Sequence, residues 1–132
     1  MMERRDHKPN LGERELDIMQ VLWRHGEAAV AEVQAHLAAS GVTVAYTTVQ
    51  TLLNRLEAKE MVARRTVERA HRYRALAAEP AVVDSAIGRL AERFFSGSVE
   101  RLATRLVESD LQPEQLDRLR ALIDAHRVGR GE

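Results

Sequence analysis

The stretch Ala45-Tyr-Thr-Thr-Val-Gln-Thr-Leu-Leu-Asn-Arg-Leu56 decides the fold of this 132-residue chain. Its apolar residues follow the spacing i, i+3, i+4, i+7, which predicts an amphipathic helix from about Ala45 to Lys59. They are Val49, Leu52, Leu53 and Leu56. The opposite face carries threonine, glutamine, asparagine and arginine in place of the usual glutamate and lysine. Short hydrogen-bonding side chains of this kind are suited to reading the edges of DNA bases.

Two further apolar-periodic segments precede this helix. The first begins after Gly12, which is a tolerated N-cap residue. Leu11 and Leu16 flank this start and can form a hydrophobic staple, and the helix stops at His25-Gly26. Its predicted core stripe is Leu16, Ile18, Met19, Leu22 and Trp23. The second carries Val30, Val33 and Leu37 and ends near Ser40-Gly41. Three short helices joined by short turns predict a helix-turn-helix.

An arginine-rich segment follows the third helix. Residues 64–74 hold five arginines and one acid, Glu68, a local net charge of +4 in a chain whose 20 basic and 20 acidic residues balance. Alternation predicts two short strands, 62–66 and 71–76. The link 67–70 lacks an Asn-Gly or Asp-Gly signal, so we expect a rather loose loop. A helix-turn-helix followed by such a hairpin is a winged helix.

The predicted base-reading residues lie on the outward face of the third helix. They are Thr47, Gln50, Thr51 and Asn54. Phosphate contacts are predicted for Tyr46, Thr48, Arg55, Arg65, Arg69, His71 and Arg72. A plainer interpretation stays open, in which Thr47 and Thr48 cap the helix and Gln50 and Asn54 are only solvated. In the same way, Arg55 could pair with Glu57 or Glu60, and the hairpin arginines could simply protect an edge strand.

Glu79-Pro80 marks a boundary, after which three amphipathic helices follow. About 45 residues of this kind cannot close a core alone, so we expect them to pack against a second copy of the chain. The residues predicted to make that dimer are Val83, Ile87, Leu90, Phe94, Leu102, Leu106, Leu116, Leu119 and Ile123. The predicted organisation is a disordered arm (1–10), a winged helix (11–78), a helical dimerisation domain (79–127) and a tail (128–132), and the fold class is mainly α.

Composition excludes several classes of protein. There is no cysteine, so disulfides and thiolate metal sites are ruled out. No apolar run of about 18 residues exists to cross a membrane, and Met1–Asn10 is too polar for a signal peptide, so we expect a cytoplasmic protein. The five histidines lack zinc-hydrolase spacing, and no phosphate-binding glycine loop or nucleophile elbow occurs. We therefore expect no enzyme activity, no cofactor and no metal. For His36 and His126 we favour surface positions over the alternative, a metal site across a dimer.

Three motifs together resemble the penicillinase-repressor (BlaI/MecI) family of bacterial transcription regulators. They are L-G-x-x-E-L-x-I-M-x-x-L-W (11–23), A-Y-T-T-V-x-T-L-L-x-R-L-x-x-K (45–59) and A-H-R-Y (70–73). The resemblance covers roughly residues 10–126. It implies a homodimer with an N-terminal winged helix and a C-terminal helical dimerisation domain, which represses transcription by binding a palindromic DNA operator.

The chain departs from that family at identifiable places. It lacks the cysteine motif of the copper-responsive branch. In the β-lactam branch a membrane sensor-protease cleaves an Asn-Phe bond, and Arg105-Leu106 occupies the matching place here. A sensor protease is therefore one candidate partner, with release by a ligand as the other possibility. Glu60 replaces a common glycine, and Ala29 a common Ser/Thr cap. The main alternative function is a helical module whose winged helix binds a protein.

Overall fold

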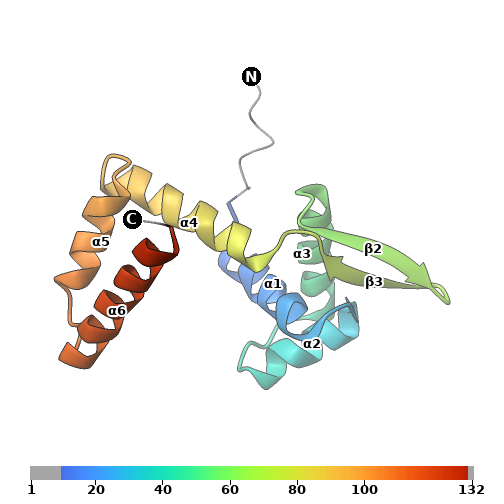
Figure 1. The fold of residues 1–132 in the computed structure, drawn as a ribbon. Helices are drawn as coiled ribbons and strands as arrows, with labels where there is room; N and C mark the ends of the chain where they lie inside the picture. The colour runs from blue at the N-terminus through green and yellow to red at the C-terminus, as the bar shows by residue number, and fades with distance from the viewer. Residues whose placement is uncertain (1–9, 131–132) are drawn as a thin grey trace. The chain divides into compact units, whose positions relative to one another are not determined.

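A computed structural model describes residues 10–130 of the chain. Contacts divide it into two compact units, 1–85 and 86–132, and each is described by itself. The elements of the fold (Figure 1) are α1 (Glu13–His25), β1 (Ala28–Ala29), α2 (Val30–Ala39), α3 (Tyr46–Ala58), β2 (Val62–Val67), β3 (Ala70–Ala75), α4 (Glu79–Phe94), α5 (Val99–Val107) and α6 (Pro113–Gly129). The predicted mainly α class with a small antiparallel wing is confirmed.

The predicted helix ends are confirmed in the first unit. The backbone N–H of Gly12 donates to Glu15 Oε1 at 2.8 Å, which satisfies one of the free donors at the start of α1. Gly26 ends that helix with φ +86°, a conformation that glycine adopts without steric cost. Ala29 precedes α2 without a side-chain cap, but the carboxylate of Glu32 accepts from its N–H at 2.8 Å.

The core of the first unit joins the three helices to the hairpin. All four predicted apolar residues of α3 are buried, and so are Ile18, Met19 and Leu22 of α1 and Val30, Val33 and Leu37 of α2. Tyr73 of β3 is 1% exposed and packs in this core, as do Met61 and Val62. Leu16 is 37% exposed, so its prediction as a core residue was wrong. Trp23 packs at the margin, and its indole Nε1–H donates to the Ala77 carbonyl oxygen at 2.9 Å.

The sheet contains one strand that the sequence analysis did not predict. β1 pairs antiparallel with β3, placing Ala29 opposite Arg72, so the strand order is β1-β3-β2. Two residues are too few to show any alternation, which is why β1 was missed. The predicted loose link between the hairpin strands was wrong. Val67 pairs with Ala70, and Glu68 and Arg69 alone form the turn with φ +52° and +71°. Two successive positive φ angles are typical of a type I′ turn, whose twist matches that of the strands.

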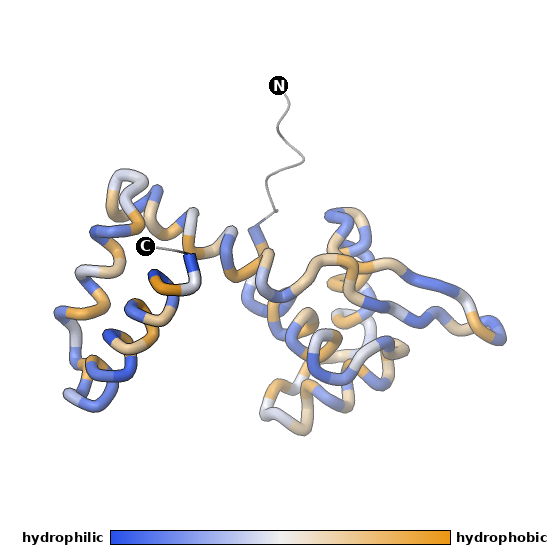
Figure 2. The backbone as a smooth tube through the Cα atoms, in the orientation of Figure 1, coloured by the Kyte–Doolittle hydropathy of each residue, from blue (hydrophilic) through white to orange (hydrophobic). Residues whose placement is uncertain are grey.

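The second unit leaves most of its apolar side chains exposed. Its buried apolar residues, within the described part of the chain, are Ala91 and Leu102. Apolar positions recur along α4, α5 and α6 (Figure 2). Of the nine residues predicted to make the dimer, all but Leu102 are at least 36% exposed, and Phe94 reaches 72%. Helices with such bare apolar faces need a covering partner.

The predicted domain limits compare with the structure as follows. Residues 1–9 of the predicted arm lie outside the described part, whereas the backbone oxygen of Asn10 accepts from Lys59 Nζ at 3.0 Å. The predicted boundary at residue 79 is the start of α4, and the division by contacts falls inside that helix. α6 ends at Gly129, two residues into the predicted tail. Arg105 and Leu106 lie within α5 and are both exposed.

Candidate nucleic-acid interface

The outward face of α3 is polar and open to solvent. The four predicted base-reading residues, Thr47, Gln50, Thr51 and Asn54, are all exposed, as are Tyr46, Thr48 and Arg55. The buried face of the helix holds them in fixed directions because Val49, Leu53 and Leu56 are fully enclosed. A shallow depression of about 220 Å³ runs along this surface between Thr47, Thr48, Thr51, Leu52 and Arg55. The roles of these residues in DNA binding stay predictions.

The N-terminus of α3 keeps backbone donors available. Its N-cap is Ala45, whose side chain makes no capping hydrogen bond. Thr47 and Thr48 stand inside the helix, so the alternative that they cap it is wrong. The segment before α3 is fixed by Gln34, whose side-chain amide donates to the Val44 carbonyl oxygen at 2.9 Å. Uncapped N–H groups at a helix start attract anions such as phosphate.

The C-terminal end of α3 is tied to α1 by an ion pair whose carboxylate is buried and whose lysine is partly exposed. Lys59 Nζ lies 2.8 Å from Oε1 of Glu15, a residue only 4% exposed. Burial on its own would raise the pKa of Glu15, but hydrogen bonds from Lys59 and the Gly12 N–H, with the charges of Lys59 and Arg55, lower it below 4.5. The sequence analysis did not predict this ion pair. A contact across 44 residues leaves no local pattern to detect.

Arg55 makes no ion pair with Glu57 or Glu60 in residues 10–130, so the structure does not support that alternative. Its guanidinium stays exposed beside the depression on α3. Glu60 has φ +62°, in the left-handed region that favours glycine. Glu60 therefore replaces the common glycine at a position whose backbone conformation favours glycine.

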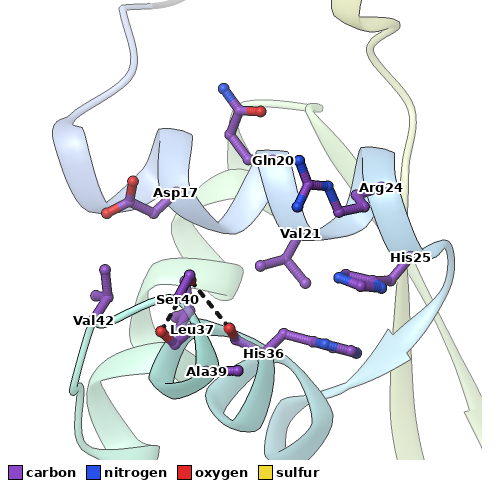
Figure 3. A pocket seen from close by; sticks show the side chains of 10 residues that line it. All are labelled: Asp17, Gln20, Val21, Arg24, His25, His36, Leu37, Ala39, Ser40 and Val42. Atoms are coloured by element: carbon purple, nitrogen blue, oxygen red, sulfur yellow. Dashed lines mark hydrogen bonds between the residues drawn. The ribbon is translucent and has the colours of Figure 1, made fainter.

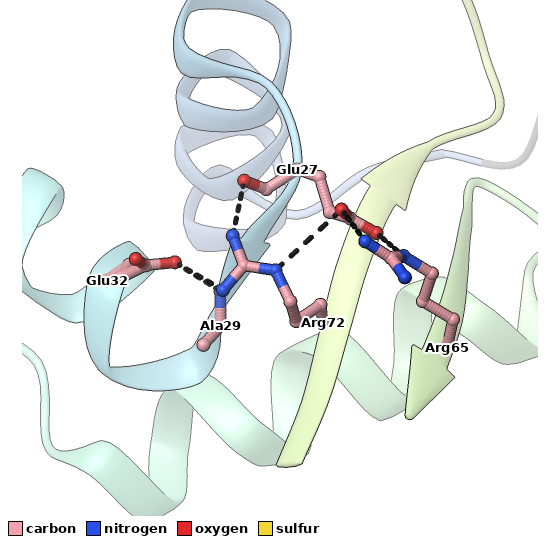
Figure 4. A network of polar contacts seen from close by, with 5 residues as sticks. All are labelled: Glu27, Ala29, Glu32, Arg65 and Arg72. Atoms are coloured by element: carbon pink, nitrogen blue, oxygen red, sulfur yellow. Dashed lines mark hydrogen bonds and ion pairs between the residues drawn. The ribbon is translucent and has the colours of Figure 1, made fainter. Parts of the chain in front are cut away.

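Three of the five hairpin arginines are held by carboxylates of the same chain. Arg64 Nε lies 3.3 Å from Glu57. The guanidinium of Arg65 donates two hydrogen bonds to the Glu27 carboxylate, of 2.6 and 2.9 Å. Arg72 donates to the Glu27 carbonyl oxygen at 3.2 Å and lies 3.2 Å from the Glu32 carboxylate (Figure 4). The predicted phosphate contacts of Arg65 and Arg72 stay untested, and both guanidinium groups already have partners in the free protein.

The other two hairpin arginines, Arg69 and Arg74, are exposed. Arg69 stands in the turn, and Arg69 and Arg74 have no ion pair or hydrogen-bonded side-chain partner in residues 10–130. His71 Nδ1 lies 3.2 Å from the Thr66 hydroxyl across the hairpin. The unpaired positive charge of the wing is therefore concentrated at two arginines, Arg69 and Arg74, and not spread over the five that the sequence contains.

Two histidines that the sequence analysis treated separately meet at the joint of α1 and α2. The rings of His25 and His36 are stacked, with centroids 3.7 Å apart and planes 12° from parallel. They line a pocket of about 360 Å³ together with Arg24, Gln20 and Ser40 (Figure 3). Partial desolvation of the ring, then the charges of His36 and Arg24, lower the pKa of His25 below 6.5.

This pair predicts a pH-dependent stability. The unfolded chain takes up a proton at His25 near pH 6.5, whereas the folded chain resists it until lower pH, so the unfolding free energy falls as the pH drops through 6.5. Urea unfolding at pH 8, 7, 6 and 5 measures this fall. His36→Gln should reduce it, because the facing imidazole is gone while Arg24 and the Glu32 carboxylate remain. Equal pH slopes in the two proteins would contradict the assignment.

The described residues offer little for other chemistry. Residues 10–130 contain no group of three or more histidine, aspartate or glutamate side chains placed to hold a metal ion. Within the same part of the chain, no helix has the length and apolar character that a membrane span requires.

Comparison with known proteins agrees with this geometry. The penicillinase repressor of Bacillus licheniformis is 25% identical over 120 residues, which cover 90% of this chain and 93% of that protein. The solution structure of the DNA-binding domain of the repressor BlaI matches at 28% identity with a TM-score of 0.50, covering 56% of this chain and 89% of that one. The crystal structure of YusO from Bacillus subtilis shares the fold at 18% identity and a TM-score of 0.50, covering 92% and 77%.

A family model described as penicillinase repressor matches residues 11–125, nearly the whole described chain. That match spans both units, from the start of α1 into α6. The chain therefore belongs to the penicillinase repressor family of DNA-binding transcriptional repressors.

Proposed function

We propose that this protein is a transcriptional repressor that binds a palindromic operator as a homodimer, without catalytic activity of its own. The observation that carries the proposal is the exposed polar face of α3, whose first turn is uncapped. It supports sequence reading by the side chains and phosphate binding by the backbone of the same helix. Membership of the penicillinase repressor family supports the same function.

Base recognition falls to Thr47, Gln50, Thr51 and Asn54. Gln50 and Asn54 carry amides that can pair with adenine through two hydrogen bonds, and each threonine offers a methyl group to thymine. All four lie on one exposed face, backed by a fully buried one. A rigid backing of this kind supports base reading because it keeps the side chains in register with the groove.

The residues proposed to bind phosphates lie beside the base-reading face of α3 and on the hairpin. Tyr46, Thr48 and Arg55 surround the start and edge of α3, and Arg69 and His71 lie on the hairpin. Of these, Arg69 is the strongest candidate because it is exposed at the turn and has no ion-pair partner within residues 10–130. Its contribution should be the same for every DNA sequence, since phosphates carry no sequence information.

Dimerisation is supported by the apolar faces of the second unit. Single chains rarely leave so many large aliphatic side chains at 36% exposure or more. A second copy would cover them symmetrically and would place two copies of α3 on two half-sites. We further propose a cytoplasmic location, and release of the operator either by a sensor protease at Arg105-Leu106 or by a ligand.

The test is DNA binding by the full chain at two salt concentrations, on the DNA flanking its own gene and on random DNA of equal length. Affinity should fall by orders of magnitude between 50 and 200 mM salt if several phosphates are contacted. Asn54→Ala should reduce the preference for the operator by roughly 1–3 kcal/mol while leaving affinity for random DNA unchanged. Arg69→Ala should weaken both and reduce the salt slope by about one.

Each arm can fail separately. A flat salt response with no binding to its own upstream DNA would favour the alternative, a module whose winged helix binds a protein. An equal loss on operator and random DNA in Asn54→Ala would remove base reading from that residue. Footprinting on the flanking DNA gives the operator itself and the symmetry of its half-sites.

A further inference from the structure

Glu27 lies at the meeting point of the α1–α2 joint and the wing. It follows Gly26, which ends α1, and it precedes β1. Its side chain is 25% exposed and binds two arginines that are seven residues apart on the hairpin. Oε2 receives Arg65 Nε at 2.6 Å, Oε1 receives Arg65 Nη2 at 2.9 Å, and Arg72 Nε lies 3.7 Å from Oε1.

The strand order shows that this contact crosses the central strand of the sheet. Ala29 of β1 pairs with Arg72 of β3, and Arg72 pairs in turn with Arg65 of β2. The carboxylate of Glu27, which starts beside β1, therefore reaches over the central strand to the far strand (Figure 4). Since β1 has only two residues, its ladder alone holds the hairpin weakly.

The two-pronged geometry of this contact gives it direction. A guanidinium bound to a carboxylate through two parallel hydrogen bonds has a fixed orientation as well as an attraction. Arg72 is fixed a second time through the Glu32 carboxylate, at 3.2 Å, and the Glu27 carbonyl oxygen. The middle of the hairpin, where Arg65 pairs with Arg72, is thereby tied to the start of α2, the helix that precedes α3 in the chain.

We propose that Glu27 is a positioning residue for DNA binding, a clasp that holds the wing so that Arg69 in its turn meets the phosphate backbone. This inference rests on the proposed function of the same surface. Arg65 and Arg72 then serve as parts of the clasp, and phosphate binding by the hairpin is left to Arg69 and His71.

The sign of the effect separates a clasp from simple electrostatics. Removing a negative charge near DNA strengthens binding wherever charge alone matters. If Glu27 merely competed with phosphates for its arginines, Glu27→Gln would release Arg65 and make the salt slope steeper by about 0.9 for each new contact. A clasp predicts the reverse, because the loosened hairpin no longer presents Arg69 in place.

The experiment compares the full-length wild type with Glu27→Gln on operator and random DNA across the salt range. We expect operator affinity to fall about fivefold to tenfold without a steeper salt slope. Amide hydrogen exchange in β2 and β3 of the free protein should become faster in the variant, while α1 and α3 keep their protection. Glu57→Gln is the matched control: it also removes one carboxylate from a hairpin arginine, Arg64, and should bind DNA as tightly as the wild type or more tightly.

A double-variant cycle closes the argument. Arg65→Gln alone should reproduce the loss, and the double variant Glu27→Gln/Arg65→Gln should lose no more than either single one. Unchanged or tighter binding by Glu27→Gln, or additive losses in the cycle, would overturn the clasp while the wild type still binds DNA. Failure of the wild type to bind any DNA would overturn the proposed function first, and the clasp with it.

Discussion

Phe94→Asp should convert the protein to a monomer and reduce operator affinity by about 10²–10⁴-fold, the gain that linking two half-site contacts provides. Phe94 is the most exposed of the predicted dimer residues, at 72%, so a charge there costs the single folded chain little. In a dimer the same carboxylate would be buried without a partner, which is strongly unfavourable. Sedimentation equilibrium gives the mass, and gel-shift titration gives the affinity.

Leu76→Asp is the control for this experiment. Leu76 is also an exposed large apolar residue, at 50%, but it precedes α4 and is absent from the predicted dimer set. It should leave both mass and affinity unchanged. A dimeric Phe94→Asp protein with wild-type affinity would show that α4 is not part of the interface, and α5 and α6 would then be tested in the same way through Leu106 and Ile123.

Leu53→Ala should lower the free energy of unfolding by about 2–5 kcal/mol, the usual range for truncating a buried leucine. Leu53 is fully buried in α3 at the centre of the first unit's core. The loss combines transfer of the side chain with the cavity left behind. Denaturant unfolding followed by circular dichroism measures it, and the apparent operator affinity should fall because less protein is folded.

Thr51→Ala provides the opposite case on the same helix. Thr51 is exposed, so its truncation should change stability by less than about 0.5 kcal/mol. It should nevertheless relax the preference for the operator. If Thr51→Ala destabilised the protein as much as Leu53→Ala, the orientation of α3 derived from its apolar spacing would be wrong.

Much of the fold could be predicted because its determinants are local. The spacing of Val49, Leu52, Leu53 and Leu56 fixed the inward face of α3, and the structure buries all four. The outward face followed directly, since helix geometry leaves no freedom once one face is buried.

The errors lie where long-range pairing overrides local pattern. The contacts of Arg65 and Arg72 with Glu27, about 40 residues earlier in the chain, were not predicted. The strand β1 exists only because β3 offers it a partner. The pairing of Glu15 with Lys59 across the unit was not predicted. None of these contacts has a spacing that the sequence displays.

The turn of the hairpin carries an evolutionary consequence. Glu68 and Arg69 both adopt positive φ, at +52° and +71°, where glycine sits without steric cost and asparagine at a reduced one. A chain selected for stability alone would drift toward Asn-Gly at this point. Two charged residues there make the hairpin less stable than Asn-Gly would, and the phosphate contact proposed for Arg69 gives its guanidinium a functional reason to occupy this position. Drift among relatives should therefore be freer at Glu68 than at its neighbour.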